Sequence, residues 1–161
     1  MTASKIVAAA ASGVGGAGLD VDEVFSTFLY TGNATTRNIQ NGVDLTEGGL
    51  VWTKCRNATD GHQLYDTERG VTKRLKSESS DAEGTDTNEV TAINSNGYNL
   101  NQDGGGTNGN GNTYVSWTWR KAPKFFDVVT YTGNGNSARA IAHSIGGTVG
   151  SVIIRKLDSI E

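Results

Sequence analysis

The sequence predicts an all-β fold: an antiparallel β-sandwich-like module with an extended N-terminal arm and a second, partial β-module. Three observations predict it. The 161 residues include 22 Gly together with many Asn, Ser and Thr residues, which are poor helix formers. Short stretches rich in β-branched and aromatic residues recur, separated by turn signals such as Asn41-Gly42 and Asn96-Gly97. One group of motifs returns about a hundred residues later, which indicates module duplication.

Residues 1–23 form the predicted arm. They are rich in Ala and Gly and end in an acidic turn at Asp20–Glu23. The apolar run 6–11 is short and lacks Leu and Phe, so we favour a small-residue arm over a secretory signal peptide. If the arm anchors the chain, the anchoring side chains are expected to be Lys5, Ile6, Val7, Val14 and Leu19.

Residues 24–122 form the predicted sandwich-like module. Val21, Val24, Phe25 and Phe28 have helical spacing, but the β-branched and aromatic content of 24–30 favours a strand. The further strands expected in this module are 36–39, 49–54, 63–66, 72–75, 89–93, 98–100 and 113–120.

The clearest strand is 113–120. Its alternation puts Val115, Trp117 and Trp119 on one face, which we expect to be the core face. The preceding residues 102–112 are nearly all Gly, Asn and Thr, so they are expected to form an exposed loop.

Residues 123–161 read as a partial second copy of the module. The motif at 28–33 returns at 129–134, and the motif at 49–54 returns in weaker form at 150–155. Strands are therefore expected at 127–131, 138–143 and 149–156. Two interpretations remain open: the chain begins a longer array, or these strands pair with the first module or with another subunit.

Composition and charge exclude several classes of protein. The net charge of −3 argues against nucleic-acid binding through bulk charge, and no apolar run is long enough to cross a bilayer. Leu, Ile, Val and Phe make up only about a fifth of the residues, so the core should be thin. We expect neither a nucleic-acid nor a membrane partner.

Chemistry-bearing residues form no convincing catalytic set. Cys55 has basic neighbours that could favour a reactive thiolate, but its alternation along a strand favours a structural role. Asp66 and Glu68 could form a glycosidase carboxylate pair, yet Arg69 and Arg74 should neutralise them. The acidic stretch 81–86 is read as a solvated loop, and His62 and His143 have no ligand spacing. We expect no enzyme activity, metal or cofactor.

Aromatic residues offer a binding alternative. Tyr65, Tyr98 and Trp119 could stack on sugar rings if they are exposed, while Asn and Thr side chains from the loops supply hydrogen bonds. The competing interpretation is that they belong to the core, as Trp in a β protein usually does.

Several stretches resemble a family of tail-associated, tail fibre-like virion proteins of tailed bacteriophages that is common in marine phages. The resemblance covers most of residues 20–156, and the Ala/Gly-rich start is also similar. The stretches that carry it are 24–33, 41–45, 47–52, 64–70 and the long block 116–133, SWTWRKAPKFFDVVTYTG.

The resemblance implies a structural virion protein located in the phage tail. We expect the N-terminal anchoring part of a homotrimeric tail fibre involved in host attachment, with tail proteins such as an adaptor or nozzle as partners. The alternatives are a glycan-binding or glycan-cleaving β-sandwich that acts on host surface polysaccharide, and a head decoration protein.

Overall fold

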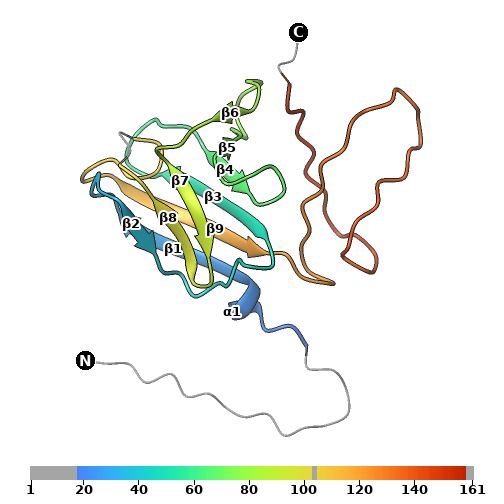
Figure 1. The fold of residues 1–161 in the computed structure, drawn as a ribbon, viewed down its shortest axis with the longest axis horizontal. Helices are drawn as coiled ribbons and strands as arrows, with labels where there is room; N and C mark the ends of the chain where they lie inside the picture. Colours follow the sequence, from blue (N-terminus) through green and yellow to red (C-terminus); the bar gives the residue numbers. More distant parts are fainter. Residues whose placement is uncertain (1–17, 103–104, 159–161) are drawn as a thin grey trace, which may run out of the picture.

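A computed structural model describes residues 18–102 and 105–158 (Figure 1). A one-turn helix precedes a series of strands joined by turns. The elements are α1 (Val21–Val24), β1 (Phe25–Thr31), β2 (Arg37–Ile39), β3 (Gly49–Cys55), β4 (Gln63–Asp66), β5 (Lys73–Arg74), β6 (Gly84–Thr85), β7 (Val90–Asn94), β8 (Gly97–Leu100) and β9 (Thr113–Arg120).

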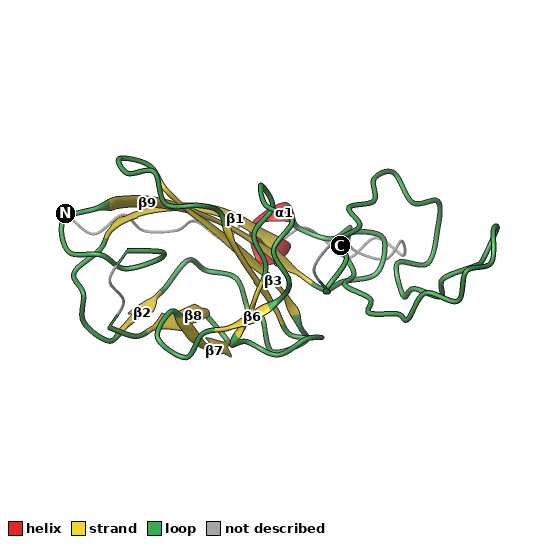
Figure 2. Cartoon of the chain, turned by 90° about the horizontal axis from the view of Figure 1, so that it is seen from above, coloured by secondary structure: helices red, strands yellow, loops and turns green. Residues whose placement is uncertain are grey.

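The strands form two facing layers. The larger sheet has the order β1-β9-β3-β4, and the smaller one has the order β2-β8-β7. Every pairing is antiparallel, and the hairpin of β5 and β6 adds a small third sheet. Figure 2 shows the long strands β1, β3 and β9 above β2, β7 and β8. The predicted all-β class is confirmed.

The core lies between these two layers. It is small and partly polar, because Thr53, Ser116 and Thr118 are fully buried within it. Its apolar members are Tyr30, Ile39, Val43, Leu45, Val51, Cys55, Tyr65, Val90, Tyr98, Leu100 and Tyr114. The thin core expected from the composition is therefore centred on four tyrosines rather than on Leu and Phe.

The prediction for the core face of β9 was wrong. Tyr114, Ser116 and Thr118 face the core, so the alternate residues Trp117 and Trp119 face outward and are half-buried. Tyr114 and Thr118 can occupy the core face because their hydroxyls find partners there. The Tyr114 hydroxyl donates to the Gly105 carbonyl at 2.7 Å, and Asn41 Nδ2 donates to Thr118 Oγ1 at 2.8 Å.

The connections follow the turn chemistry of the sequence, with two differences. Gly97 closes the β7–β8 hairpin with φ of 107°, a backbone conformation that favours glycine. Residues 21–24 form α1 instead of entering the strand, since the Asp20 side chain accepts a hydrogen bond from the Asp22 amide and caps the turn. Strand β6, which we did not expect, pairs with β5.

The C-terminal segment, residues 123–158, contains none of the three predicted strands. Residues 127–131, 138–143 and 149–156 have no regular secondary structure. In Figure 1 the segment, coloured orange to red, lies to one side of the sandwich. A strand needs a neighbour for its backbone groups, and no sheet of the described residues extends to this segment.

Two sets of hydrogen bonds tie the C-terminal segment together and to the sandwich. Near its start, the Lys124 amide donates to the Ile145 carbonyl at 2.6 Å. Near its end, the Arg155 guanidinium donates to the carbonyls of Ser79 and Asp81, both at 2.6 Å. The Glu83 amide donates to the Leu157 carbonyl at 2.7 Å. Next to this second attachment, Val152, Ile153 and Ile154 expose apolar side chains to solvent.

Candidate functional site

Two of the three predicted sugar-stacking residues lie in the core. Tyr65 and Tyr98 are both 0% exposed, so the prediction that they stack on a ligand was wrong. The Tyr65 hydroxyl donates to the buried Glu89 carboxylate, which also accepts from Arg74. Burial raises the pKa of Tyr98 well above the ordinary tyrosine value. Sequence periodicity could not reveal that these two tyrosines are buried, because tyrosine is common both in cores and on binding surfaces.

The third residue, Trp119, belongs to an aromatic surface on the outward side of the larger sheet. We define the outer aromatic face as Phe25, Trp52, Trp117, Trp119 and Phe126. Strand register produces it, since Trp117 lies opposite Trp52 on β3, and Trp119 lies opposite Phe25 on β1. The ring centroids of Trp52 and Trp117 are 6.0 Å apart, and those of Phe25 and Trp119 are 5.3 Å apart.

This outer aromatic face is partly covered by the protein itself. Phe126 stacks on Trp119 with ring centroids 6.1 Å apart and an interplanar angle of 26°. Trp52 Nε1 donates to His62 Nδ1 at 2.8 Å. These contacts leave the three tryptophans half-buried. Within the described part of the chain, His62 is the one hydrogen-bond partner of a tryptophan side chain on this face, which offers little for orienting a polar ligand.

The carboxylates considered for catalysis are engaged in ion pairs. Arg69 Nε lies 2.6 Å from Asp66 Oδ2, and Lys121 Nζ lies 2.8 Å from Glu68 Oε1. Arg69 therefore neutralises Asp66 as expected, whereas Lys121 takes the role expected of Arg74 at Glu68. The sequence could not identify Lys121, which is 53 residues away from Glu68.

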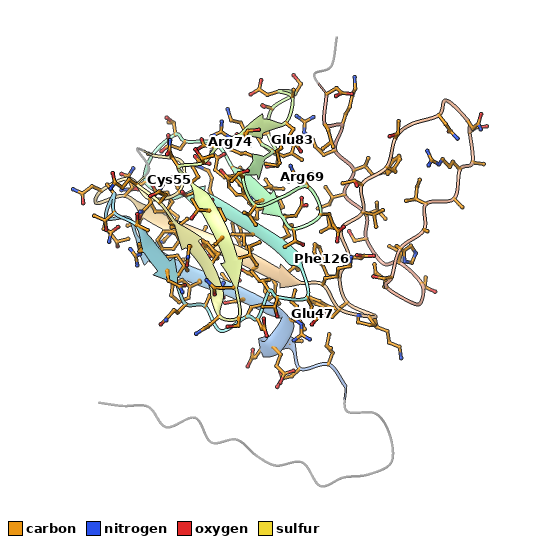
Figure 3. The ribbon with its side chains drawn as sticks, in the orientation of Figure 1. Glu47, Cys55, Arg69, Arg74, Glu83 and Phe126 are labelled. Atoms are coloured by element: carbon orange, nitrogen blue, oxygen red, sulfur yellow. The ribbon has the colours of Figure 1, made fainter. Side chains whose placement is uncertain are left out.

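Arg74 forms ion pairs with two other carboxylates at the same end of the molecule. It pairs with Asp86 at 3.1 Å and with Glu89 at 3.3 Å, while Arg69 also reaches Glu83 at 3.0 Å. Figure 3 shows Arg69, Arg74 and Glu83 gathered at the β5–β6 hairpin. The acidic stretch 81–86 is therefore only partly a solvated loop: Asp81 is exposed, whereas Glu83 pairs with Arg69 beyond the hairpin and Asp86 pairs with Arg74 within it.

The remaining reactive residues have structural environments. Cys55 is buried at the end of β3, and its Sγ lies 3.5 Å from Asn57 Oδ1. His143 is exposed in the C-terminal segment, apart from His62. Among residues 18–102 and 105–158, no three His, Cys, Asp or Glu side chains are grouped so that they could hold a metal ion.

The predicted anchoring residues are only partly within the structure. Lys5, Ile6, Val7 and Val14 lie outside the described residues, and Leu19 is 44% exposed just before α1. In the described part of the chain, α1 is four residues long, and no helix there reaches the length and hydrophobicity of a bilayer span.

The largest departure from an ordinary soluble surface is in the C-terminal segment. Val152, Ile153 and Ile154 are 66%, 78% and 72% exposed, although they are consecutive and strongly apolar. Val129 and Tyr131, from the same segment, are also exposed. Contiguous apolar exposure of this kind is typical of surfaces that contact another macromolecule.

The fold is an all-β sandwich followed by a C-terminal segment without regular secondary structure. The chain belongs to a family described as Domain of unknown function (DUF7483), whose profile matches residues 20–161. Comparisons with curated proteins and with solved structures found no significant match.

Proposed function

We propose that the chain is a structural, non-enzymatic virion protein: the N-terminal anchoring part of a homotrimeric phage tail fibre that takes part in host attachment. The observation that carries the proposal is the exposed apolar stretch at Val152–Ile154, held beside a small sandwich core. A protein that functions as an isolated monomer has little reason to keep three consecutive aliphatic residues in water. A subunit of an assembly covers them with its neighbours.

The state of the reactive side chains supports this role. Asp66 and Glu68 are neutralised by Arg69 and Lys121, and Cys55 is buried, so none of the residues considered for catalysis is poised for it. The resemblance of residues 20–156 to tail-associated virion proteins supplies the location. Tail proteins such as an adaptor or nozzle are the proposed attachment partners of the arm.

Labelling of purified particles tests the location. An antibody raised against residues 20–158 and coupled to gold should decorate the tail of the phage that carries the chain, as seen by electron microscopy. Decoration of the head would support a head decoration protein instead. Particles that contain no detectable chain by immunoblotting would overturn the virion assignment.

Deletion of residues 2–18 tests the anchoring role. The shortened chain should keep the circular dichroism spectrum and melting temperature of the β-sandwich, because the core cluster of the described residues runs from Tyr30 to Tyr114. It should no longer be incorporated into particles in a complementation experiment. Normal incorporation would show that the arm is not the anchor.

A second candidate function is the binding of host surface polysaccharide at the outer aromatic face. Its specific support is the row formed by Trp52, Trp117 and Trp119, since flat indole rings stack on sugars. A glycan array should then show binding that is lost in Trp117→Ala. An array without binding, together with tryptophan fluorescence that oligosaccharides leave unchanged, would remove this candidate.

A further inference from the structure

The edge of the larger sheet at β1 is open. Strand β1 pairs with β9 on one side and is the last strand of its sheet. On the β9 side, the Gly32 amide donates to the Asn112 carbonyl, whereas the Thr31 carbonyl accepts from Arg37. Backbone groups of alternate residues point to the same edge, so Thr27 and Leu29, like Thr31, direct their amide and carbonyl groups outward.

The outward backbone groups of Thr27 and Leu29 remain available for pairing. Thr27 and Leu29 are exposed, and neither has a backbone partner at this edge among residues 18–102 and 105–158. The strand FSTFLYT has no charge, Gly or Pro, so it lacks the features that block pairing with another chain. An open groove of about 430 Å³ runs beside its first half, lined by residues of α1, β1 and the Asn41-Gly42 turn.

The C-terminal segment contains a stretch that has the sequence of a strand but pairs with no strand of the described residues. Residues 150–155 correspond to β3, which has antiparallel neighbours on both sides, β9 and β4. The same kind of sequence thus forms a central strand when neighbours are present. Arg155 and Leu157 hold its end against residues 79–83, which presents Val152, Ile153 and Ile154 to solvent at a fixed place.

Charge favours one relative direction of β1 and the C-terminal stretch 150–155. The exposed acidic residues Asp20, Asp22 and Glu23 precede β1, and two basic residues, Arg155 and Lys156, follow the exposed aliphatic stretch. In an antiparallel pairing Lys156 approaches the acidic end of β1, whereas a parallel pairing would separate them. Opposite charges at strand ends therefore favour the antiparallel arrangement.

We propose that residues 149–156 of one copy of this chain add as an antiparallel strand to the open edge of β1 in a second copy. The inference rests on the self-association part of the proposed function, and it names the surfaces that meet. The proposed contact is a strand addition, in which main-chain hydrogen bonds join the two copies and alternate side chains give specificity. The two surfaces are different, so the contact is head-to-tail and can close into a ring such as a trimer.

The first test measures the mass of the full chain by size-exclusion chromatography with light scattering at micromolar concentration. The unmodified chain should have a multiple of the 16.9 kDa chain mass. Thr27→Pro removes an outward amide, and Ile153→Asp places a charge in the pairing stretch; each should return the mass to that of one chain. Tyr131→Asp, at an exposed site of the C-terminal segment outside the pairing stretch, is the matched control and should leave the mass unchanged.

The second test fixes the direction by disulfide cross-linking between copies. Cross-linking should be several-fold stronger in mixtures of Thr27→Cys with Ile154→Cys and of Leu29→Cys with Val152→Cys. The swapped pairs, Thr27→Cys with Val152→Cys and Leu29→Cys with Ile154→Cys, are the comparison. Cys55 is buried and can stay. Cross-linking favoured in the swapped pairs would overturn the antiparallel arrangement.

A monomeric unmodified chain would overturn strand exchange, as would Ile153→Asp with an unchanged oligomeric mass. Because Ile153 is exposed, this variant should fold even if Thr27→Pro does not. Failure of strand exchange can be distinguished from failure of the virion proposal. Gold labelling can still find the chain on the tail even if its oligomer does not depend on these strands.

Discussion

Two regions of the molecule carry related sequences in different structures. Residues 28–33, which contain most of β1, return as residues 129–134, in a part of the C-terminal segment without regular structure. Tyr30 is 8% exposed and stacks on Tyr114, whereas its counterpart Tyr131 is 47% exposed. The comparison teaches that these residues form a strand only where a partner strand, here β9, is present.

The local contacts of the repeat are nevertheless the same in both regions. The Arg37 guanidinium lies 5.7 Å from the Tyr30 ring centroid and donates to the Thr31 carbonyl. The Arg139 guanidinium lies 5.7 Å from the Tyr131 ring centroid and donates to the Thr132 carbonyl. Short-range interactions are therefore sufficient to shape the turn, while the strands depend on long-range pairing.

Replacing the paired tyrosines should produce the largest difference between the regions. Tyr30→Ala removes a buried ring from the core and the hydroxyl that donates to the Thr107 carbonyl at 2.7 Å, so it should cost about 3–5 kcal/mol of unfolding free energy. Tyr131→Ala should cost less than about 1 kcal/mol, because the ring is half in solvent. Urea unfolding followed by circular dichroism measures both, and equal losses would contradict the comparison.

The paired glycines should produce an intermediate difference. A Cβ at Gly32 would overlap the Gly109 carbonyl oxygen, whereas a Cβ at Gly133 would meet open space. Gly32→Ala should therefore destabilise the sandwich by about 1–3 kcal/mol, and Gly133→Ala should change its stability by no more than about 0.5 kcal/mol. Melting temperatures of the two variants provide the measurement. A fall for Gly133→Ala as large as that for Gly32→Ala would show that the second copy is packed after all.

The smallest effect concerns the attachment of the C-terminal segment. Partial burial alone would raise the pKa of Asp127, but hydrogen bonds from Ser144 and Lys121 outweigh it and hold the pKa below its usual value. The carboxylate form is thus favoured in the folded state. Its contribution is present above the ordinary carboxyl pKa of about 4 and is lost as the pH falls through the lowered value.

Nuclear magnetic resonance of the Ser144 amide can follow this loss, because the amide donates to Asp127 Oδ2 at 2.6 Å. Its shift should stay constant at neutral pH and change only below about pH 4. In Asp127→Asn the neutral-pH shift should already differ, while core amides stay unchanged. A shift that titrates near neutral pH would contradict the assignment.

Much of the sandwich could be predicted from the sequence. The strands expected at 36–39, 49–54, 63–66 and 113–120 agree with β2, β3, β4 and β9 within one residue at each end. Turn residues such as Gly97 mark a connection whatever the rest of the chain does. The candidate ligand site was less predictable, since Tyr65 and Trp119 look alike in sequence and only their positions relative to the second sheet separate core from surface.

The sequence by itself determined the all-β class, the turns and the local Arg–Tyr contacts, because these depend on neighbouring residues. Only the tertiary structure decided which face of β9 is buried and whether the second copy of the motifs becomes strands. The core face of β9 consists of Tyr114, Ser116 and Thr118, and the hydroxyls of Tyr114 and Thr118 form hydrogen bonds there, so the tryptophans are left outside. The second copy lacks a partner strand in the described chain, and backbone pairing is what turns a β-rich sequence into a sheet.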